Sequence, residues 1–104
     1  MNRQELPAKL VGTNQLVIFD FLSDLAPGES ISGQTVAPSV YSGTDAVPGA
    51  LLSGAAIQGP TVSTVSQRVV GGIVGTMYEL LCTVTTSSGQ TLQKVGVLAV
   101  VPDL

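Results

Sequence analysis

The pattern of apolar and polar positions is most regular between Met77 and Val101. Two runs, 77–86 and 91–101, are rich in Thr, Val and Leu, and the residues between them, Ser87-Ser88-Gly89-Gln90, have the composition of a turn. The pattern predicts one long β-hairpin that the rest of the chain covers. The hairpin contains no motif typical of a catalytic or ligand-binding site.

A turn centred on Ser88-Gly89 fixes which residues of the two strands face each other. One row is then apolar throughout and predicted to face the core, with the pairs Cys82/Val95, Leu80/Val97 and Tyr78/Ala99. The opposite row has the pairs Met77/Val100, Glu79/Leu98, Leu81/Gly96 and Thr83/Lys94. A slip of one residue would exchange the two rows, so the register is itself a prediction.

The second row is apolar at the open end of the hairpin. A sandwich buries only one face of each sheet, so this surplus is either covered by the N-terminal segment or forms an interface. The residues predicted for that interface are Met77, Leu81, Leu98 and Val100.

Two residues of the first hairpin strand have predicted structural roles. Tyr78 follows Gly75-Thr76-Met77, as in the tyrosine corner of immunoglobulin-like sandwiches, where the phenol hydroxyl bonds an upstream backbone group. Cys82 is the single cysteine of the chain, so no intrachain disulfide can form. We expect it to be a buried thiol that packs as a small apolar side chain.

Further strands are predicted before the hairpin. The segment 14–22 is apolar on both faces apart from Asp20, which is typical of a strand that lies centrally or under a neighbouring subunit. The segment 29–42 changes phase near Gln34, which indicates a bulge, and Pro38 favours a sheet edge. Two shorter strands are expected within 51–57 and 61–70.

A length of 104 residues is typical of a single domain. Gly, Pro and β-branched residues interrupt every window that could form a helix of ordinary length. About six or seven short strands at roughly ten-residue spacing predict an all-β fold, an immunoglobulin-like sandwich of two antiparallel sheets over residues 13–104. Residues 1–12, mixed and polar with Pro7, are expected to form an arm that orders against a partner.

Composition and charge narrow the possible partners. Charged residues make up 11% of the chain, and the net charge is −3 with four basic residues. Binding to a nucleic-acid backbone requires clustered cations, so nucleic acid is not expected as a partner. No apolar run approaches the roughly 20 residues of a membrane span, and the N-terminus lacks the apolar core of a signal peptide, which predicts synthesis in the cytoplasm.

The sequence predicts neither catalysis nor a cofactor. It contains no His, so the commonest general base and metal ligand is missing. The acids that could converge lack the spacing of a calcium loop and lie next to turns, where Asp caps backbone N–H groups: they are Asp20, Asp24, Glu29 and Asp45. The glycines of 71–75 precede no helix, so they do not form a phosphate-binding loop.

Turn and strand motifs between Asn14 and Val101 carry a family resemblance. They are Ser42-Gly43-Thr44-Asp45, Val70-Gly71-Gly72-x-x-Gly75-Thr76-x-Tyr78 and the stretch from Thr83 to Leu92, followed by a Val-rich last strand. With these motifs the chain resembles the small immunoglobulin-like virion proteins of tailed bacteriophages, often described as fiber-tail adaptors. The resemblance implies a location in the virion, no catalytic residues, and many copies bound to tail, fiber, portal or capsid proteins.

The function predicted from the sequence is that of a structural adaptor in the tail or fiber attachment region of a tailed phage. A capsid decoration protein that clamps neighbouring capsomers is the nearest alternative. A module that grips cell-surface glycans is the third, for which Tyr41, Asp45 and the Thr-rich tip near Ser88 are the candidate residues.

Overall fold

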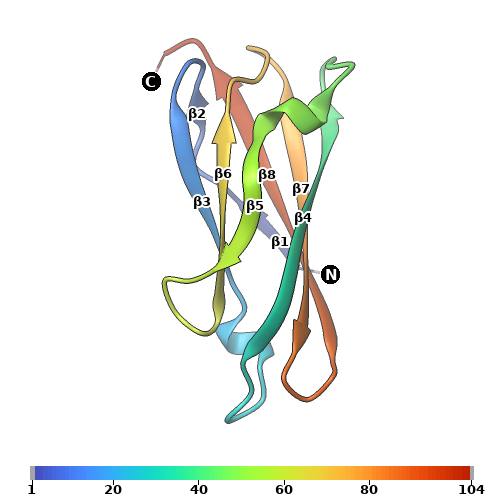
Figure 1. Ribbon diagram of the computed structural model, residues 1–104. Helices are drawn as coiled ribbons and strands as arrows, with labels where there is room; N and C mark the ends of the chain where they lie inside the picture. The colour runs from blue at the N-terminus through green and yellow to red at the C-terminus, as the bar shows by residue number, and fades with distance from the viewer. Residues whose placement is uncertain (1, 104) are drawn as a thin grey trace.

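The computed structural model describes residues 2–103, which form two β-sheets that face each other and enclose one core (Figure 1). The five-stranded sheet has the order β1-β8-β7-β4, with β2 also paired to β8, and the three-stranded sheet has the order β3-β6-β5. The elements are β1 (Asn2–Glu5), β2 (Lys9–Leu10), β3 (Asn14–Asp20), η1 (Leu22–Asp24), β4 (Ile31–Ser42), η2 (Pro48–Leu51), β5 (Leu52–Gln58), β6 (Thr64–Val70), β7 (Met77–Thr86) and β8 (Thr91–Val101).

The prediction of an all-β fold in two sheets is confirmed, and the five-stranded sheet is mixed rather than antiparallel. β1 and β2 run parallel to β8, whereas the pairs β7–β8, β4–β7, β3–β6 and β5–β6 are antiparallel. The domain is elongated, with principal-axis extents of 42 × 22 × 21 Å. The helices among the described residues are the two short 3-10 turns η1 and η2, and none is long and apolar enough to cross a bilayer.

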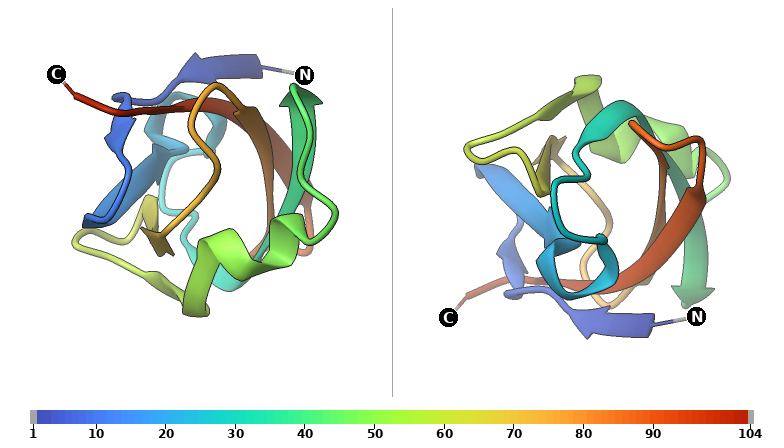
Figure 2. Two further views of the ribbon diagram at one scale, coloured as in Figure 1. Left: turned by 90° about the horizontal axis from the view of Figure 1, so that it is seen from above. Right: turned by 90° about the horizontal axis from the view of Figure 1, so that it is seen from below.

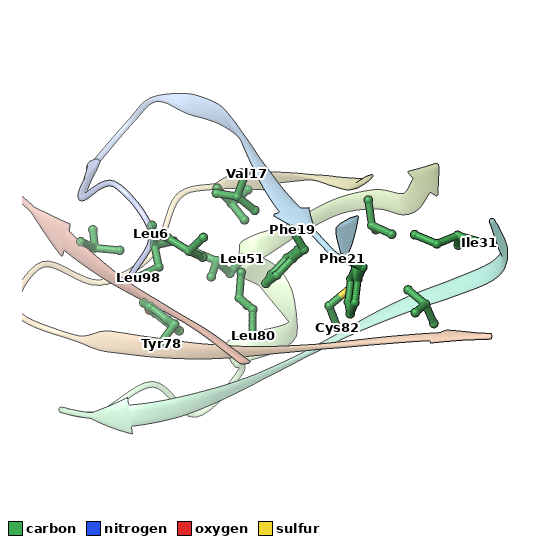
Figure 3. Close-up of a cluster of buried hydrophobic side chains, with 14 residues drawn as sticks. Leu6, Val17, Phe19, Phe21, Ile31, Leu51, Tyr78, Leu80, Cys82 and Leu98 are labelled. Carbon is green, nitrogen blue, oxygen red and sulfur yellow. The ribbon is translucent and has the colours of Figure 1, made fainter. Parts of the chain in front are cut away.

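Side chains from both sheets point into the space between them and form the core (Figure 3). Alternate residues of each strand face inward because successive side chains of a strand point to opposite faces. The core residues are Leu6, Val17, Phe19, Phe21, Ile31, Leu51, Val65, Val69, Tyr78, Leu80, Cys82, Val84, Leu98 and Val100.

Cys82 lies in this core, as predicted. Burial raises the pKa of its thiol to about 12, because the thiolate would lose its hydration, while the nearby Lys94 charge acts in the opposite direction. The thiol is therefore protonated at neutral pH and packs as an apolar group.

The predicted hairpin has the correct strand limits but the wrong register. Thr85 lies opposite Thr91, and Tyr78 lies opposite Leu98 instead of Ala99. The turn contains three residues rather than two, because the Thr86 N–H bonds the Gln90 carbonyl (2.9 Å) and Gly89 takes the positive φ of 92° that ends such loops.

This one-residue difference exchanges the two faces of β8 and corrects part of the predicted interface. Leu98 is 0% exposed and Val100 is 1% exposed, and both belong to the core. Met77 and Leu81 are half-buried on the outer face, as predicted. Their neighbours across the ladder are Ala99 and Val95.

β3 and β4 are both edge strands. β3 is an edge strand of the three-stranded sheet, so the central position that its two apolar faces suggested is wrong, while the alternative, a position under a neighbouring subunit, stays a prediction. β4 is an edge strand, as Pro38 predicted. Its irregularities lie between Ile31 and Gly33 and between Val40 and Ser42, so the bulge near Gln34 was placed a little too far along the chain.

The N-terminal segment packs along β8 of its own chain, and seen from the end of the domain β1 lies against that strand (Figure 2). Leu6 is buried in the core and Lys9 is 0% exposed. The Lys9 ammonium donates to the carbonyls of Gly71 (2.9 Å) and Leu10 (3.1 Å), and burial lowers its pKa. The segment therefore covers one edge of the five-stranded sheet and ties the β6–β7 loop to it.

Candidate attachment surfaces

The four acids considered as a possible metal site hold loops and turns in place: they are Asp20, Asp24, Glu29 and Asp45. The described residues contain no group of three or more His, Cys, Asp or Glu side chains that could hold a metal ion. Asp20 Oδ1 accepts the Leu22 N–H (2.9 Å), and Asp24 pairs with Lys94 (3.4 Å). Glu29 accepts hydrogen bonds from the hydroxyls of Thr86 and Ser88 at the hairpin turn.

Tyr78 forms the predicted tyrosine corner. Its hydroxyl oxygen accepts the Ile73 N–H (2.9 Å), and its hydroxyl donates to Asp45 Oδ2 (2.7 Å). Burial and this bond to Asp45 raise the pKa of the phenol. Asp45 Oδ1 also accepts the Val47 N–H (2.9 Å). The buried Tyr78 side chain therefore joins the loop after β4, which it contacts at Asp45, to the loop before β7, which it contacts at Ile73.

The residues proposed for glycan recognition do not come together. Val40 lies opposite Tyr78 and Ile31 lies opposite Thr86, which places Tyr41 near one end of β4 and Ser88 near the other. Asp45 is already engaged by Tyr78 and Val47.

The outer face of the five-stranded sheet carries apolar side chains on both sides of Glu79 at the open end of the hairpin. Met77 and Leu81 of β7 are half-buried there, and β8 contributes Val95 and Val97 to the same face. Val95 and Val97 are 6% and 7% exposed. The surplus of apolar residues that the sequence indicated thus exists, but the β8 residues in it are different.

A second apolar surface lies on the outer face of the three-stranded sheet. Leu16 and Ile18 of β3 are 42% and 38% exposed, and Ile57 of β5 is 60% exposed. Together with Ala55, Pro60 and Arg68 they line a shallow groove of about 390 Å³. The sequence indicated this surface through the second apolar row of the segment 14–22, which forms β3. That row alone predicts neither the pairing of β3 with β6 nor the contribution of β5 to the surface.

Both surfaces present apolar side chains. The chain matches a family described as Podophage GP4 fiber-tail adaptor protein gp77 over residues 14–99. The chain belongs to this family of fiber-tail adaptors. No curated protein and no solved structure matches it.

The family establishes what kind of protein this is. The adaptor is a structural component of the podophage virion tail and is not an enzyme, and its partners are phage structural proteins. The match gives no support to the capsid-decoration alternative. It also agrees with the absence of a catalytic motif from the sequence, where no His is present.

Proposed function

We propose that the adaptor connects fiber and tail through the outer faces of its two sheets, with many copies held in a symmetric assembly. An adaptor has to hold two bodies at once, and the outer faces of two stacked sheets point in opposite directions. The observation that carries the proposal is that each of these faces presents apolar side chains, Met77 and Leu81 on one and Leu16, Ile18 and Ile57 on the other.

The edges of the five-stranded sheet are less suited to attachment. β1 and β2 pair with β8, so the edge strands on that side have only 4 and 2 residues and offer little ladder to an incoming strand. At the other edge, β4 contains Pro38, which cannot donate a ladder hydrogen bond, and it deviates from regular register at both ends. Contact through side chains of the faces is therefore the mechanism that we favour.

We also propose that the fold is an immunoglobulin-like sandwich in which residues 1–12 act as an arm on a domain of residues 13–104. In an immunoglobulin domain one sheet has neighbouring strands C, F and G and the other has B, E and D. The orders β4-β7-β8 and β3-β6-β5 correspond to these when β3 is taken as the second strand. The Tyr78 corner further supports this relationship.

Attachment through a few apolar side chains is sufficient when copies act together. Full burial of an apolar side chain contributes about 1.5 to 3 kcal/mol, so a single copy would bind weakly through Met77 and Leu81. Linked copies raise the overall affinity without any new contact.

Incorporation into particles tests this function. We expect Leu81→Asp to fold normally, because Leu81 lies on the outer face, and to reduce the adaptor content of complemented virions at least tenfold. The desolvation of a new carboxylate in an apolar contact is the physical reason. Leu22→Asp is the matched control, since Leu22 is 68% exposed and lies outside both faces. Wild-type incorporation of Leu81→Asp, measured by mass spectrometry of purified particles, would exclude this face as an attachment surface.

A further inference from the structure

The groove on the three-stranded sheet has a structural origin in β5. This strand is paired with β6 at Leu52 and Ser53 and again at Ile57 and Gln58, and leaves the ladder between Ser53 and Ile57. Gly54 takes a positive φ of 75° in the interruption, and the small Ala55 follows it. Because the interrupted stretch carries no large side chain, the apolar residues on either side of it border a hollow instead of a flat face.

The groove is charged at one end. Arg68 lies opposite Leu16 in the β3–β6 ladder, and its guanidinium donates to Asn14 Oδ1 (3.4 Å). Arg68 makes no ion pair with any residue in the described part of the chain. By contrast, Lys9 is buried against carbonyls and Lys94 pairs with Asp24. Arg68 is therefore a cation available to a partner.

The opposite end of the same face is acidic. Asp20 belongs to the same outer row of β3 as Leu16 and Ile18, and lies opposite Thr64. A ligand that lies along β3 would thus meet a cation first, then an apolar stretch, and then a carboxylate. Outward side chains of a strand repeat about every 6.6 Å, which matches alternate residues of an extended peptide.

We propose that this groove receives an extended segment of the fiber protein. The segment carries apolar side chains at alternate positions, which fill the hollow beside Leu16, Ile18 and Ile57, and a carboxylate that pairs with Arg68. Arg is well suited to this task because its planar guanidinium binds a carboxylate through two hydrogen bonds. The inference rests on the proposed function and names the site and the chemistry of one of its two contacts.

The shape of the two faces assigns the groove to the fiber rather than to the tail. A groove of about 390 Å³ accommodates a few side chains of a single extended segment and not a broad surface. The outer face of the five-stranded sheet is formed by longer strands, 10 residues in β7 and 11 in β8, and suits a broad partner such as the tail body.

Binding of the purified fiber protein of the same phage to the purified adaptor tests the inference. We expect Ile57→Ser and Arg68→Glu each to weaken fiber binding at least tenfold, measured by surface plasmon resonance. Arg68→Lys, which keeps the charge, should recover most of the affinity. Leu22→Ser is the matched control for loss of an exposed apolar side chain and should stay within twofold of wild type. All four substitutions replace side chains outside the core, so the variants should fold.

The outcomes separate this inference from the proposed function. If the groove variants bind fiber as wild type does, the groove is not the fiber site, although the adaptor function stands. If they lose binding to purified tail, or lose self-association in analytical ultracentrifugation, while fiber binding persists, the occupant is the tail or a second copy and the inference is overturned. A wild-type adaptor that binds neither fiber nor tail would overturn the proposed function as well.

Discussion

Leu98→Asp is expected to unfold the adaptor or to lower its free energy of unfolding by at least about 4 kcal/mol. Leu98 is 0% exposed and belongs to the core between the two sheets. The substitution removes a buried apolar side chain, which alone costs about 2 to 5 kcal/mol, and places an unpaired carboxylate in its position. Since domains of this size are stable by about 5 to 15 kcal/mol, most of the stability is lost. Urea unfolding followed by circular dichroism measures the change.

Leu81→Asp is the matched control for this experiment. Leu81 lies on the other face of the hairpin, where a new carboxylate reaches solvent, so the free energy of unfolding should change far less. The comparison tests the register directly, because a slip of one residue along β8 would move Leu98 to the outer face. A native-like Leu98→Asp variant would contradict the register.

Tyr78→Phe is expected to lower the free energy of unfolding by about 1 to 3 kcal/mol, the cost of leaving buried polar groups without partners. The substitution keeps the ring in the core but removes the hydroxyl that accepts the Ile73 N–H and donates to Asp45. The two loops that meet at this hydroxyl should also exchange amide hydrogens faster, because their shared anchor is lost. Chemical denaturation and hydrogen exchange measure the two effects.

The control for this substitution is Tyr41→Phe. Tyr41 is 53% exposed at the end of β4, and substitutions at such surface positions usually change stability by less than about 0.5 kcal/mol. Equal effects of the two substitutions would contradict the anchoring role of the Tyr78 hydroxyl.

The sequence predicted correctly those features that depend on residues close together in the chain. The limits of β7 and β8 follow from two β-rich runs that a turn separates, and the inward row from Tyr78 to Cys82 follows from strand periodicity. The register required one further fact, whether the turn contains two or three residues. Ser88-Gly89 suits the shorter turn by composition, but the positive φ of Gly89 serves the longer one.

The N-terminal segment could not be predicted because its structure depends on contacts that are distant in the chain. Lys9 looks like a surface residue in the sequence, yet its ammonium bonds the carbonyl of Gly71, 62 residues away. Parallel pairing with β8 leaves no local pattern in such short strands, β2 having 2 residues and β1 having 4.

The orientation of the four residues predicted for the hairpin interface was correct in part. Met77 and Leu81 lie on the outer face, as predicted, whereas the register error assigned Leu98 and Val100 to that face although both lie in the core. Their role in an interface stays a prediction. The second apolar row of the first strand correctly indicated an uncovered surface. The groove itself depends on the interruption of the β5–β6 pairing between Ser53 and Ile57. The small residues in this stretch do not by themselves predict that interruption.

A cryo-EM map of the intact virion tests the central claim most directly. The account predicts density for this 10.6 kDa domain where fibers meet the tail, repeated in a symmetric assembly, with the two outer faces of each copy turned toward different partners. Copies spread over the icosahedral shell, or no copy on the particle, would contradict it.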